Sequence, residues 1–307
     1  MGLLSGRVAV VTGGGRGIGA SVCRLLAAEG AAVVVNDLGS AEDGTSADAG
    51  PAAEVAKEIV DAGGQAVANS GDVSSTSVGR ELVEQAIDSF GKLDILVNAA
   101  GILRDRMIFN LSEEDWDAVI RVHLKGHYST IRPAAEYWRQ QRNESGQFRL
   151  INFTSGSGLR GSPGQPNYAA AKMGVVGLTY SCARALARYG VTSNAIAPGA
   201  RTRLTETVAL ERRLRDNSDK SVSPDNIAPI VAYLASERSG WCTSRVIESR
   251  GYQLGLYNMP EVICQINSAG PWELGDLAES VEKLFQPLAN GLPASPFDKQ
   301  LASLSHG

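Results

Sequence analysis

Long apolar runs, paired cysteine motifs and a strong excess of one charge are all missing from this sequence of 307 residues. No apolar run reaches the ~18 residues of a membrane-spanning helix, and the first predicted strand begins almost at the amino terminus, without a signal peptide. None of the four cysteines forms a Cys-x-x-Cys pair; they are Cys23, Cys182, Cys242 and Cys264. Isolated thiols suit a reducing compartment, so we expect a cytoplasmic protein.

The charge balance and composition exclude other classes. A formal charge of −4 gives no general attraction to nucleic acid or to an acidic membrane, so neither is expected as a partner. With 43% hydrophobic residues, the chain can bury a full core in one large α/β domain.

Apolar segments with strand and helix character alternate along the chain. We expect strands near 7–12, 31–37, 66–71, 94–98, 149–154, 192–197 and 245–249. Helices are expected near 17–30, 52–63, 75–90, 112–142, 166–189 and 225–236. Such alternation predicts a Rossmann-type, doubly wound parallel sheet of about seven strands, with helices on both faces. Ligands then collect at the carboxyl ends of the strands.

The first strand leads into a glycine-rich turn. Residues 7–12 are mostly β-branched or small, and the glycines that follow allow a pyrophosphate to approach the backbone N–H groups that open a helix. Taken alone, such a loop is equally consistent with an ordinary turn. If it binds a nucleotide, the contacting residues are Gly13, Arg16, Gly17, Ile18 and Gly19.

The second strand ends in a carboxylate, Asp37, followed by Leu38. A carboxylate there accepts hydrogen bonds from both adenosine ribose hydroxyls and repels a 2′-phosphate. Arg16 argues the other way, because a guanidinium in the turn could bind that phosphate. We give Asp37 more weight and predict NAD over NADP, with Asp37 and Leu38 in contact with the nucleotide.

Tyr168 and Lys172 lie four residues apart, so a helix places them on one face. An ammonium beside a phenol favours the phenolate and lowers its pKa. Ser155, from another segment, could hold a carbonyl or alcohol oxygen against that phenol. The alternative is a surface Tyr-Lys pair, but beside a nucleotide site the three residues form apparatus for moving a proton on and off a carbinol oxygen.

Together these motifs resemble the short-chain dehydrogenase/reductase family over about residues 5–250. The resemblance implies that Ser155, Tyr168 and Lys172 are catalytic and that Tyr168 and Lys172 also contact the cofactor. It implies further cofactor contacts at Asp72, Val73, Asn98, Ala99, Gly101, Pro198, Gly199 and Thr202. Ala99 departs mildly from the family's Asn-Asn-Ala-Gly.

His123 stands where the family usually has a supporting asparagine. An imidazole can also bind backbone and a water chain toward the lysine, so His123 is a candidate for proton relay; a buried structural histidine is the alternative. His127 lies one turn further along, but no third ligand is placed to complete a metal site, and no metal is expected.

A closer resemblance exists within that family. Val35–Gly39, Ala100–Met107, Glu114–Asp117 and Val122–Gly126 are similar to the (3R)-hydroxyacyl-CoA dehydrogenase domain of multifunctional enzyme type 2 and its bacterial stand-alone relatives, in which His123 is normal. The resemblance implies an NAD-dependent oxidoreductase for a 3-hydroxyacyl-CoA or a hydroxysteroid, acting as a homodimer or homotetramer. A biosynthetic ketoreductase for a carrier-bound or polyketide ketone is the alternative, and a non-catalytic nucleotide-binding protein is the third possibility.

Two regions are expected to set the substrate. Residues 201–215 carry five arginines that could bind the phosphates of coenzyme A, or could form a solvated helix face with glutamate partners. Arg104 and Arg106 are weaker candidates of the same kind. We assign residues 1–251 to the nucleotide-binding domain and 252–307 to an extension, in which a helical apolar stripe from Leu274 to Leu288 could cover the substrate cleft or a neighbouring subunit. From Asn290 onward we expect fraying.

Overall fold

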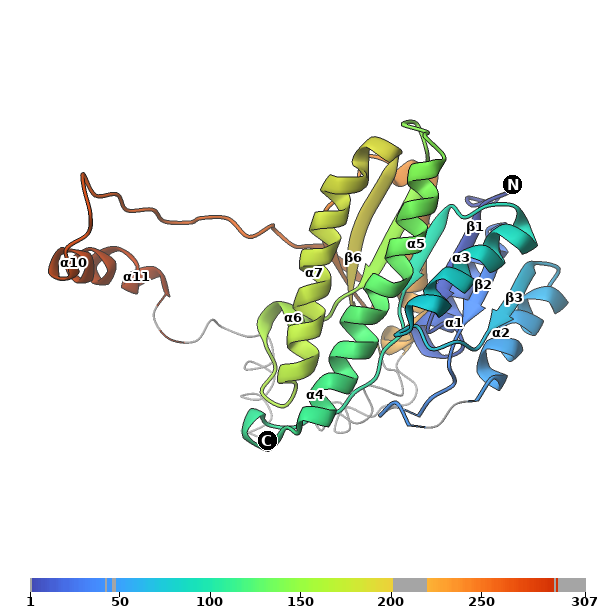
Figure 1. Cartoon of the computed structure of the whole chain (residues 1–307), viewed down its shortest axis with the longest axis horizontal. Helices are drawn as coiled ribbons and strands as arrows, with labels where there is room; N and C mark the ends of the chain where they lie inside the picture. Colours follow the sequence, from blue (N-terminus) through green and yellow to red (C-terminus); the bar gives the residue numbers. More distant parts are fainter. Residues whose placement is uncertain (1, 42, 46–47, 201–219, 290, 292–307) are drawn as a thin grey trace. The chain divides into compact units, whose positions relative to one another are not determined.

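Eight strands form one sheet in the order β3-β2-β1-β4-β5-β6-β7-β8. A computed structural model describes residues 2–41, 43–45, 48–200, 220–289 and 291 (Figure 1). The strand bounds are β1 Val8–Thr12, β2 Ala32–Asn36, β3 Gln65–Asn69, β4 Ile95–Asn98, β5 Phe148–Phe153, β6 Val191–Gly199, β7 Arg245–Arg250 and β8 Gln253–Leu256. The pairs from β3 to β7 are parallel, and β8 joins β7 antiparallel.

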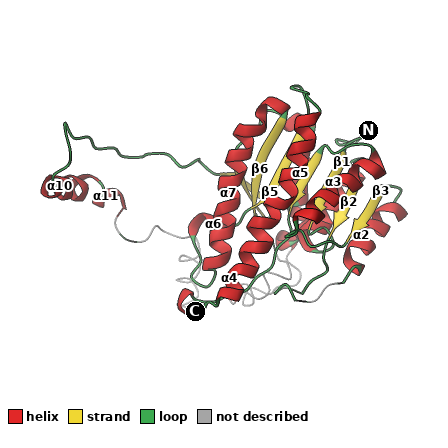
Figure 2. Cartoon of the chain, viewed as in Figure 1, coloured by secondary structure: helices red, strands yellow, loops and turns green. Residues whose placement is uncertain are grey.

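Helices cover both faces of the sheet. The helix bounds are α1 Gly17–Ala28, α2 Gly50–Asp61, α3 Thr76–Phe90, α4 Glu113–Ile120, α5 Gly126–Gln140, α6 Gly156–Arg160, α7 Pro166–Leu186 and α9 Ala228–Ala235. In Figure 2 the strands form a layer behind α3, α5 and α7. Short 3-10 turns lie at Ile108–Asn110, Ala187–Tyr189, Lys220–Val222, Pro224–Asn226 and Glu237–Ser239. The predicted doubly wound α/β fold is confirmed.

Alternation within the buried strands explains the two helical layers. In β1, Ala9 and Val11 join the core cluster that includes residues of α1, α2 and α9. Val8 and Val10 point to the other face and join residues of α3 and α5. Each fully buried valine contributes ~1.5–3 kcal/mol to the stability of the fold. Because alternate residues of one strand face opposite sides, the same strands stabilise both helical layers.

The elements that differ from the sequence prediction include β8, the short helix α6 and the middle of one long predicted helix. β8 was not predicted, because its four residues with an internal glycine give no strand pattern of useful length. The helix predicted over 112–142 is divided by a π-helical segment, Arg121–Lys125, which contains His123. π-helical turns occur often at functional sites, and no apolar periodicity marks this one in advance.

The chain divides into two compact units, Met1–Tyr257 and Asn258–Gly307. β8 carries the first unit beyond residue 251, where the sequence prediction ended the domain. In the second unit, α10 (Leu274–Leu284) and α11 (Gln286–Ala289) occur where the apolar stripe predicts a helix. Leu274, Leu284 and Leu288 of the stripe are exposed, whereas Leu277, Val281 and Phe285 are half-buried.

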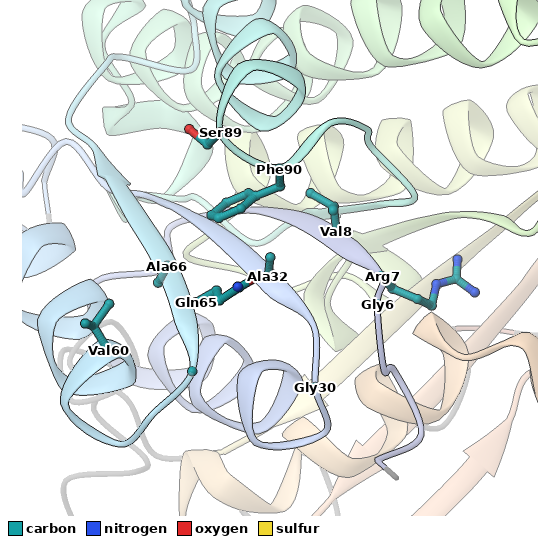
Figure 3. Close-up of a pocket in the computed structure, with 11 residues that line it drawn as sticks. Gly6, Arg7, Val8, Gly30, Ala32, Val60, Gln65, Ala66, Ser89 and Phe90 are labelled. Carbon is teal, nitrogen blue, oxygen red and sulfur yellow. The ribbon is translucent and has the colours of Figure 1, made fainter.

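A pocket of about 650 Å³ opens at the amino ends of β1, β2 and β3 (Figure 3). Its walls are mostly small or apolar, with residues such as Val8, Ala32, Val60 and Phe90. Arg7 also lines the pocket, and its guanidinium donates a hydrogen bond to the Gln147 carbonyl. This pocket lies at the edge of the sheet opposite to the predicted site residues.

Within the described part of the chain, none of the helices is both long enough and apolar enough to span a bilayer.

Candidate active site

The carboxyl edge of the sheet brings together the predicted residues of the first and second strands. A Cβ at Gly13 would lie 2.7 Å from the Ala100 backbone, and one at Gly19 would lie 1.9 Å from the Gly13 carbonyl oxygen. Only glycine permits this packing. Arg16, the residue before α1, provides no side-chain cap, so the first N–H groups of α1 remain available to an anion.

Asp37 is fixed at the end of β2 by the backbone on either side. Gly15 N–H donates to Oδ2 at 2.9 Å, and Gly39 N–H donates to Oδ1 at 2.7 Å. Each carboxylate oxygen can accept a further hydrogen bond. Arg16 Nη1 donates to the Ser40 carbonyl at 3.1 Å, so its guanidinium lies over the same loop. Both side chains that bear on nucleotide preference therefore lie beside β2.

Other predicted cofactor residues serve the fold at this edge. Asp72 Oδ1 accepts from Ser74 N–H at 2.9 Å, and Oδ2 pairs with Arg121 at 3.3 Å. Val73 is buried. Asn98 Nδ2 donates to Asn152 Oδ1 at 3.1 Å in the centre of the sheet. Ala99 N–H bonds to the Thr12 carbonyl at 3.2 Å, which joins the fourth strand to the glycine turn.

Ser155 and Tyr168 come from neighbouring segments, the residue before α6 and the start of α7. Ser155 precedes α6, and its Oγ accepts from Ser157 N–H at 3.1 Å. The Ser155 side chain acts on the Tyr168 phenol and lowers its pKa. α7 begins at Pro166, a residue well suited to a first helical turn, so Tyr168 lies near its start. The two hydroxyls can hold one small oxygen atom between them.

Lys172 lies one turn after Tyr168 and is buried. Its Nζ donates to the Phe153 carbonyl at 2.6 Å and lies 5.7 Å from the centre of the Tyr168 ring. Burial lowers the pKa of Lys172 to about 7. Burial also raises the pKa of Tyr168 to about 12; the Ser155 side chain opposes this rise, and the charge of Asp105 adds to it. The sequence predicts a lowered phenol pKa, but burial is the largest effect on Tyr168 and raises its pKa.

His123 is buried against both Gly101 and Tyr168. Its Nε2 lies 2.8 Å from the Ile102 carbonyl oxygen, and its ring meets the Tyr168 ring edge-on at 5.0 Å. A Cβ at Gly101 would lie 2.3 Å from its Cε1. His127 Nδ1 lies 2.5 Å from the His123 carbonyl oxygen. Burial and the charge of Lys172 lower the pKa of both imidazoles, that of His127 to about 3.

The orphan nitrogens of the two histidines bear on the predicted relay. His123 Nδ1 and His127 Nε2 are buried without a hydrogen-bond partner among the described residues. A buried polar atom without a partner is unfavourable unless water satisfies it. His123 thus lies beside the phenol, and its relay role stays a prediction.

Pro198 and Gly199 end β6, next to β7 and on the same edge of the sheet. Thr202 and the arginines of 201–215 lie outside the described residues. Arg104 is already occupied, since Nη1 pairs with Glu114 and Asp115 at 3.2 Å each and Nε donates to the Asp43 carbonyl. The predicted role of Arg104 toward coenzyme A phosphates is therefore not supported. Arg106 is exposed, so it stays a candidate for that role.

Three residues that sequence reasoning missed adjoin the Ser-Tyr pair: Asp105, Ser157 and Gln165. Gln165 Nε2 donates to Asp105 Oδ2 at 2.9 Å, and Ser157 Oγ donates to Gln165 Oε1 at 2.7 Å. Ser157 lies close to Ser155 in the sequence, and Gln165 lies close to Tyr168. This closeness was the signal that could have identified these two residues.

Comparison with known proteins agrees with this geometry. A family model described as short chain dehydrogenase matches residues 7–213. Hydroxyacyl-CoA dehydrogenase ChsB1 of Mycobacterium tuberculosis is 42% identical over 288 residues, 92% of this chain and 89% of the relative. Peroxisomal multifunctional enzyme type 2 of Drosophila melanogaster is 46% identical over 232 residues, 76% of this chain and 37% of the relative. A crystal structure of a short chain dehydrogenase from Mycobacterium avium superposes with a TM-score of 0.83 at 42% identity, covering 96% of this chain and 99% of the other.

Proposed function

The chain belongs to the short-chain dehydrogenase/reductase family, and from that premise we propose that it interconverts a 3-hydroxyacyl-CoA and its ketone using NAD. Enzymes of this family are oxidoreductases that act on CH–OH groups with a nicotinamide nucleotide. The single observation that supports catalysis here is the grouping of three side chains. Ser155 acts on the Tyr168 phenol, and buried Lys172 lies one helical turn away with its Nζ 5.7 Å from the centre of the Tyr168 ring.

The residues at the carboxyl edge fit a dinucleotide. Gly13 and Gly19 allow the turn to pack closely, and the first N–H groups of α1 have no side-chain cap, so a pyrophosphate would bind there. Asp37 keeps acceptor capacity for ribose hydroxyls. When bound, the nicotinamide supplies the hydride-accepting carbon.

The protein's own side chains handle the proton. Ser157 N–H occupies one acceptor position of Ser155 Oγ, which leaves the Ser155 O–H to donate toward the substrate oxygen. Tyr168 takes the carbinol proton in oxidation and returns it in reduction. Burial raises the pKa of Tyr168, and positive charge from Lys172 and a bound nicotinamide would lower it. Holding both hydroxyls on one oxygen combines orientation with general base assistance.

Replacement of the phenol tests this assignment. Tyr168→Phe keeps the ring and its edge contact with His123, so we expect nucleotide binding to persist while kcat falls ~10²–10⁴-fold. Steady-state NADH absorbance with 3-hydroxyacyl-CoA esters measures kcat, and fluorescence titration measures NADH binding. Turnover near that of the wild type would exclude Tyr168 as the base.

Nucleotide preference rests on Asp37 and Arg16. We expect Asp37→Ala to lose most of its NAD preference and gain affinity for NADP, because the variant keeps Arg16 beside the loop but removes the repelling carboxylate. Ratios of kcat/KM for the two nucleotides give the preference, with Asp88→Asn, far along the chain on α3, as the control. An unchanged ratio contradicts the assignment.

The substrate follows from the relatives. ChsB1 is named as a hydroxyacyl-CoA dehydrogenase, and this chain covers 89% of it. A panel of 3-hydroxyacyl-CoA esters and hydroxysteroids, each with both nucleotides, separates the two substrate classes. A biosynthetic ketoreductase is the second candidate, supported by the position of Arg16, and predicts faster ketone reduction with NADPH than with NADH.

We also propose that the protein is a homo-oligomer and that the exposed stripe on α10 and α11 covers apolar surface of the substrate site or of a neighbouring subunit. Large exposed apolar residues gathered on one helix usually mark a contact surface. Native mass spectrometry of the full chain and of a Leu277→Glu variant tests this, and an unchanged mass and KM would contradict it.

A further inference from the structure

Gln165 connects a carboxylate to the Ser-Tyr pair. Its amide donates to Asp105 Oδ2 at 2.9 Å and accepts from Ser157 Oγ at 2.7 Å. The backbone N–H of the same Ser157 donates to Ser155 Oγ. Since both ends of the amide are engaged, its orientation is fixed by Asp105.

Asp105 itself is held firmly. Asn167 Nδ2 donates to the carbonyl oxygens of Arg104 and Asp115, each at 3.1 Å, and so ties the segment after β4 to the start of α7. Arg104 adds its ion pairs with Glu114 and Asp115. Asp105 therefore cannot swing away from α7 without breaking several bonds.

The second carboxylate oxygen of Asp105 makes no hydrogen bond within the described part of the fold. Oδ1 is buried and has no hydrogen-bond partner among the described residues. The charge of Asp105 acts on the phenol, since it raises the pKa of Tyr168. Burial raises the pKa of Asp105, opposed by the hydrogen bond from Gln165 and by the charge of Arg106. Through Gln165 and Ser157, a partly buried carboxylate is thus part of the hydrogen-bond network that includes Ser155, whose hydroxyl would meet the substrate oxygen.

We propose that Asp105 is a specificity-determining residue that makes the site select uncharged acyl derivatives, such as thioesters, and reject the corresponding free 3-hydroxy acids. A free acid would bring its own carboxylate close to the reacting carbon, next to that of Asp105. Like charges repel strongly where water is partly excluded, and a thioester avoids the repulsion. Gln165 is a positioning residue, because it links Asp105 to the segment that orients Ser155. This inference rests on the proposed function and narrows its substrate class.

The test compares 3-hydroxybutyrate with its N-acetylcysteamine thioester at pH 8. In the wild type we expect turnover of the thioester and little of the acid. Asp105→Asn keeps the size and an acceptor for Gln165 but removes the charge, so the ratio of kcat/KM for acid over thioester should rise at least ~10-fold. Asp105→Glu retains the charge and should keep the wild-type ratio. Asp117→Asn, an exposed carboxylate on α4, is the matched control and should leave the ratio unchanged.

The outcomes separate this inference from the proposed function. A wild type that turns over neither compound, nor any 3-hydroxyacyl-CoA ester, overturns both. A wild type active on the thioester whose ratio is unchanged in Asp105→Asn overturns the role of Asp105 alone. Where Asp105→Asn turns over neither compound, calorimetric binding of both to the NADH-loaded protein gives the same ratio, and an unchanged binding ratio again contradicts the proposal.

Discussion

Gly101 offers a sharp test of the packing around the phenol. In Gly101→Ala, the added Cβ would lie 2.3 Å from Cε1 of His123, whereas ordinary contacts begin at 3.4 Å. The imidazole must therefore retreat by about 1 Å. Its Nε2 is bound to Ile102, and its ring meets Tyr168 at 5.0 Å, so the displacement passes to the phenol.

Gly101→Ala should change two quantities: the stability of the fold, through overpacking, and kcat, through displacement of the phenol. Forcing an extra methyl group into a filled core destabilises by ~1–3 kcal/mol. A displacement of ~1 Å at a catalytic group lowers kcat by up to ~10²-fold. Urea denaturation measures the first quantity, and NADH absorbance measures the second.

Two further variants decide whether His123 is responsible. Gly177→Ala, inside α7 with open space around it, should stabilise by ~0.5–1 kcal/mol, which shows the effect of the methyl group without the clash. Adding His123→Ala to Gly101→Ala should recover part of the stability, giving a coupling of ~1 kcal/mol or more. Additive effects of the two substitutions would refute the argument.

Two other predictions concern stability. The pKa of His127 is about 3 in the fold against 6.5 for a free imidazole, so as pH falls below 6.5 the unfolded chain takes up a proton that the folded chain refuses, and stability declines. His127→Gln should therefore lose roughly 2 kcal/mol less than the wild type between pH 6.5 and 4.5 in urea titrations, and equal losses would contradict this. Trp138 is fully buried and donates to the Leu93 carbonyl at 2.9 Å, so Trp138→Phe should destabilise by ~1–3 kcal/mol. Trp241→Phe, at 75% exposure, should change little, and thermal melting that ranks the two the other way would contradict the assignment.

The fold could be predicted because its pattern is local. Valine-rich strands alternate with helices, and each parallel strand from β1 to β7 appears within about two residues of its expected position. Ser155, Tyr168 and Lys172 come near one another because the fold class sets where strand ends and helix starts meet, and their catalytic roles stay a prediction.

What escaped prediction depends on contacts between distant segments. Asp105 and Gln165 are 60 residues apart, and nothing in either segment announces the bond between them. The raised pKa of Tyr168 has the same origin, since it follows from burial, which a Tyr-x-x-x-Lys spacing does not report. The π-helical turn at His123 likewise carries no periodic signal.

β8 has a consequence for how copies of the protein can assemble. It occupies the side of β7 that would otherwise end the sheet, and it is itself only Gln253–Leu256. A short edge strand offers few backbone groups to a foreign strand, which limits runaway polymerisation through the sheet. Leu254 and Leu256 of β8 are 63% and 67% exposed. The short length of the edge strand, and not polar side chains, therefore limits pairing with another chain.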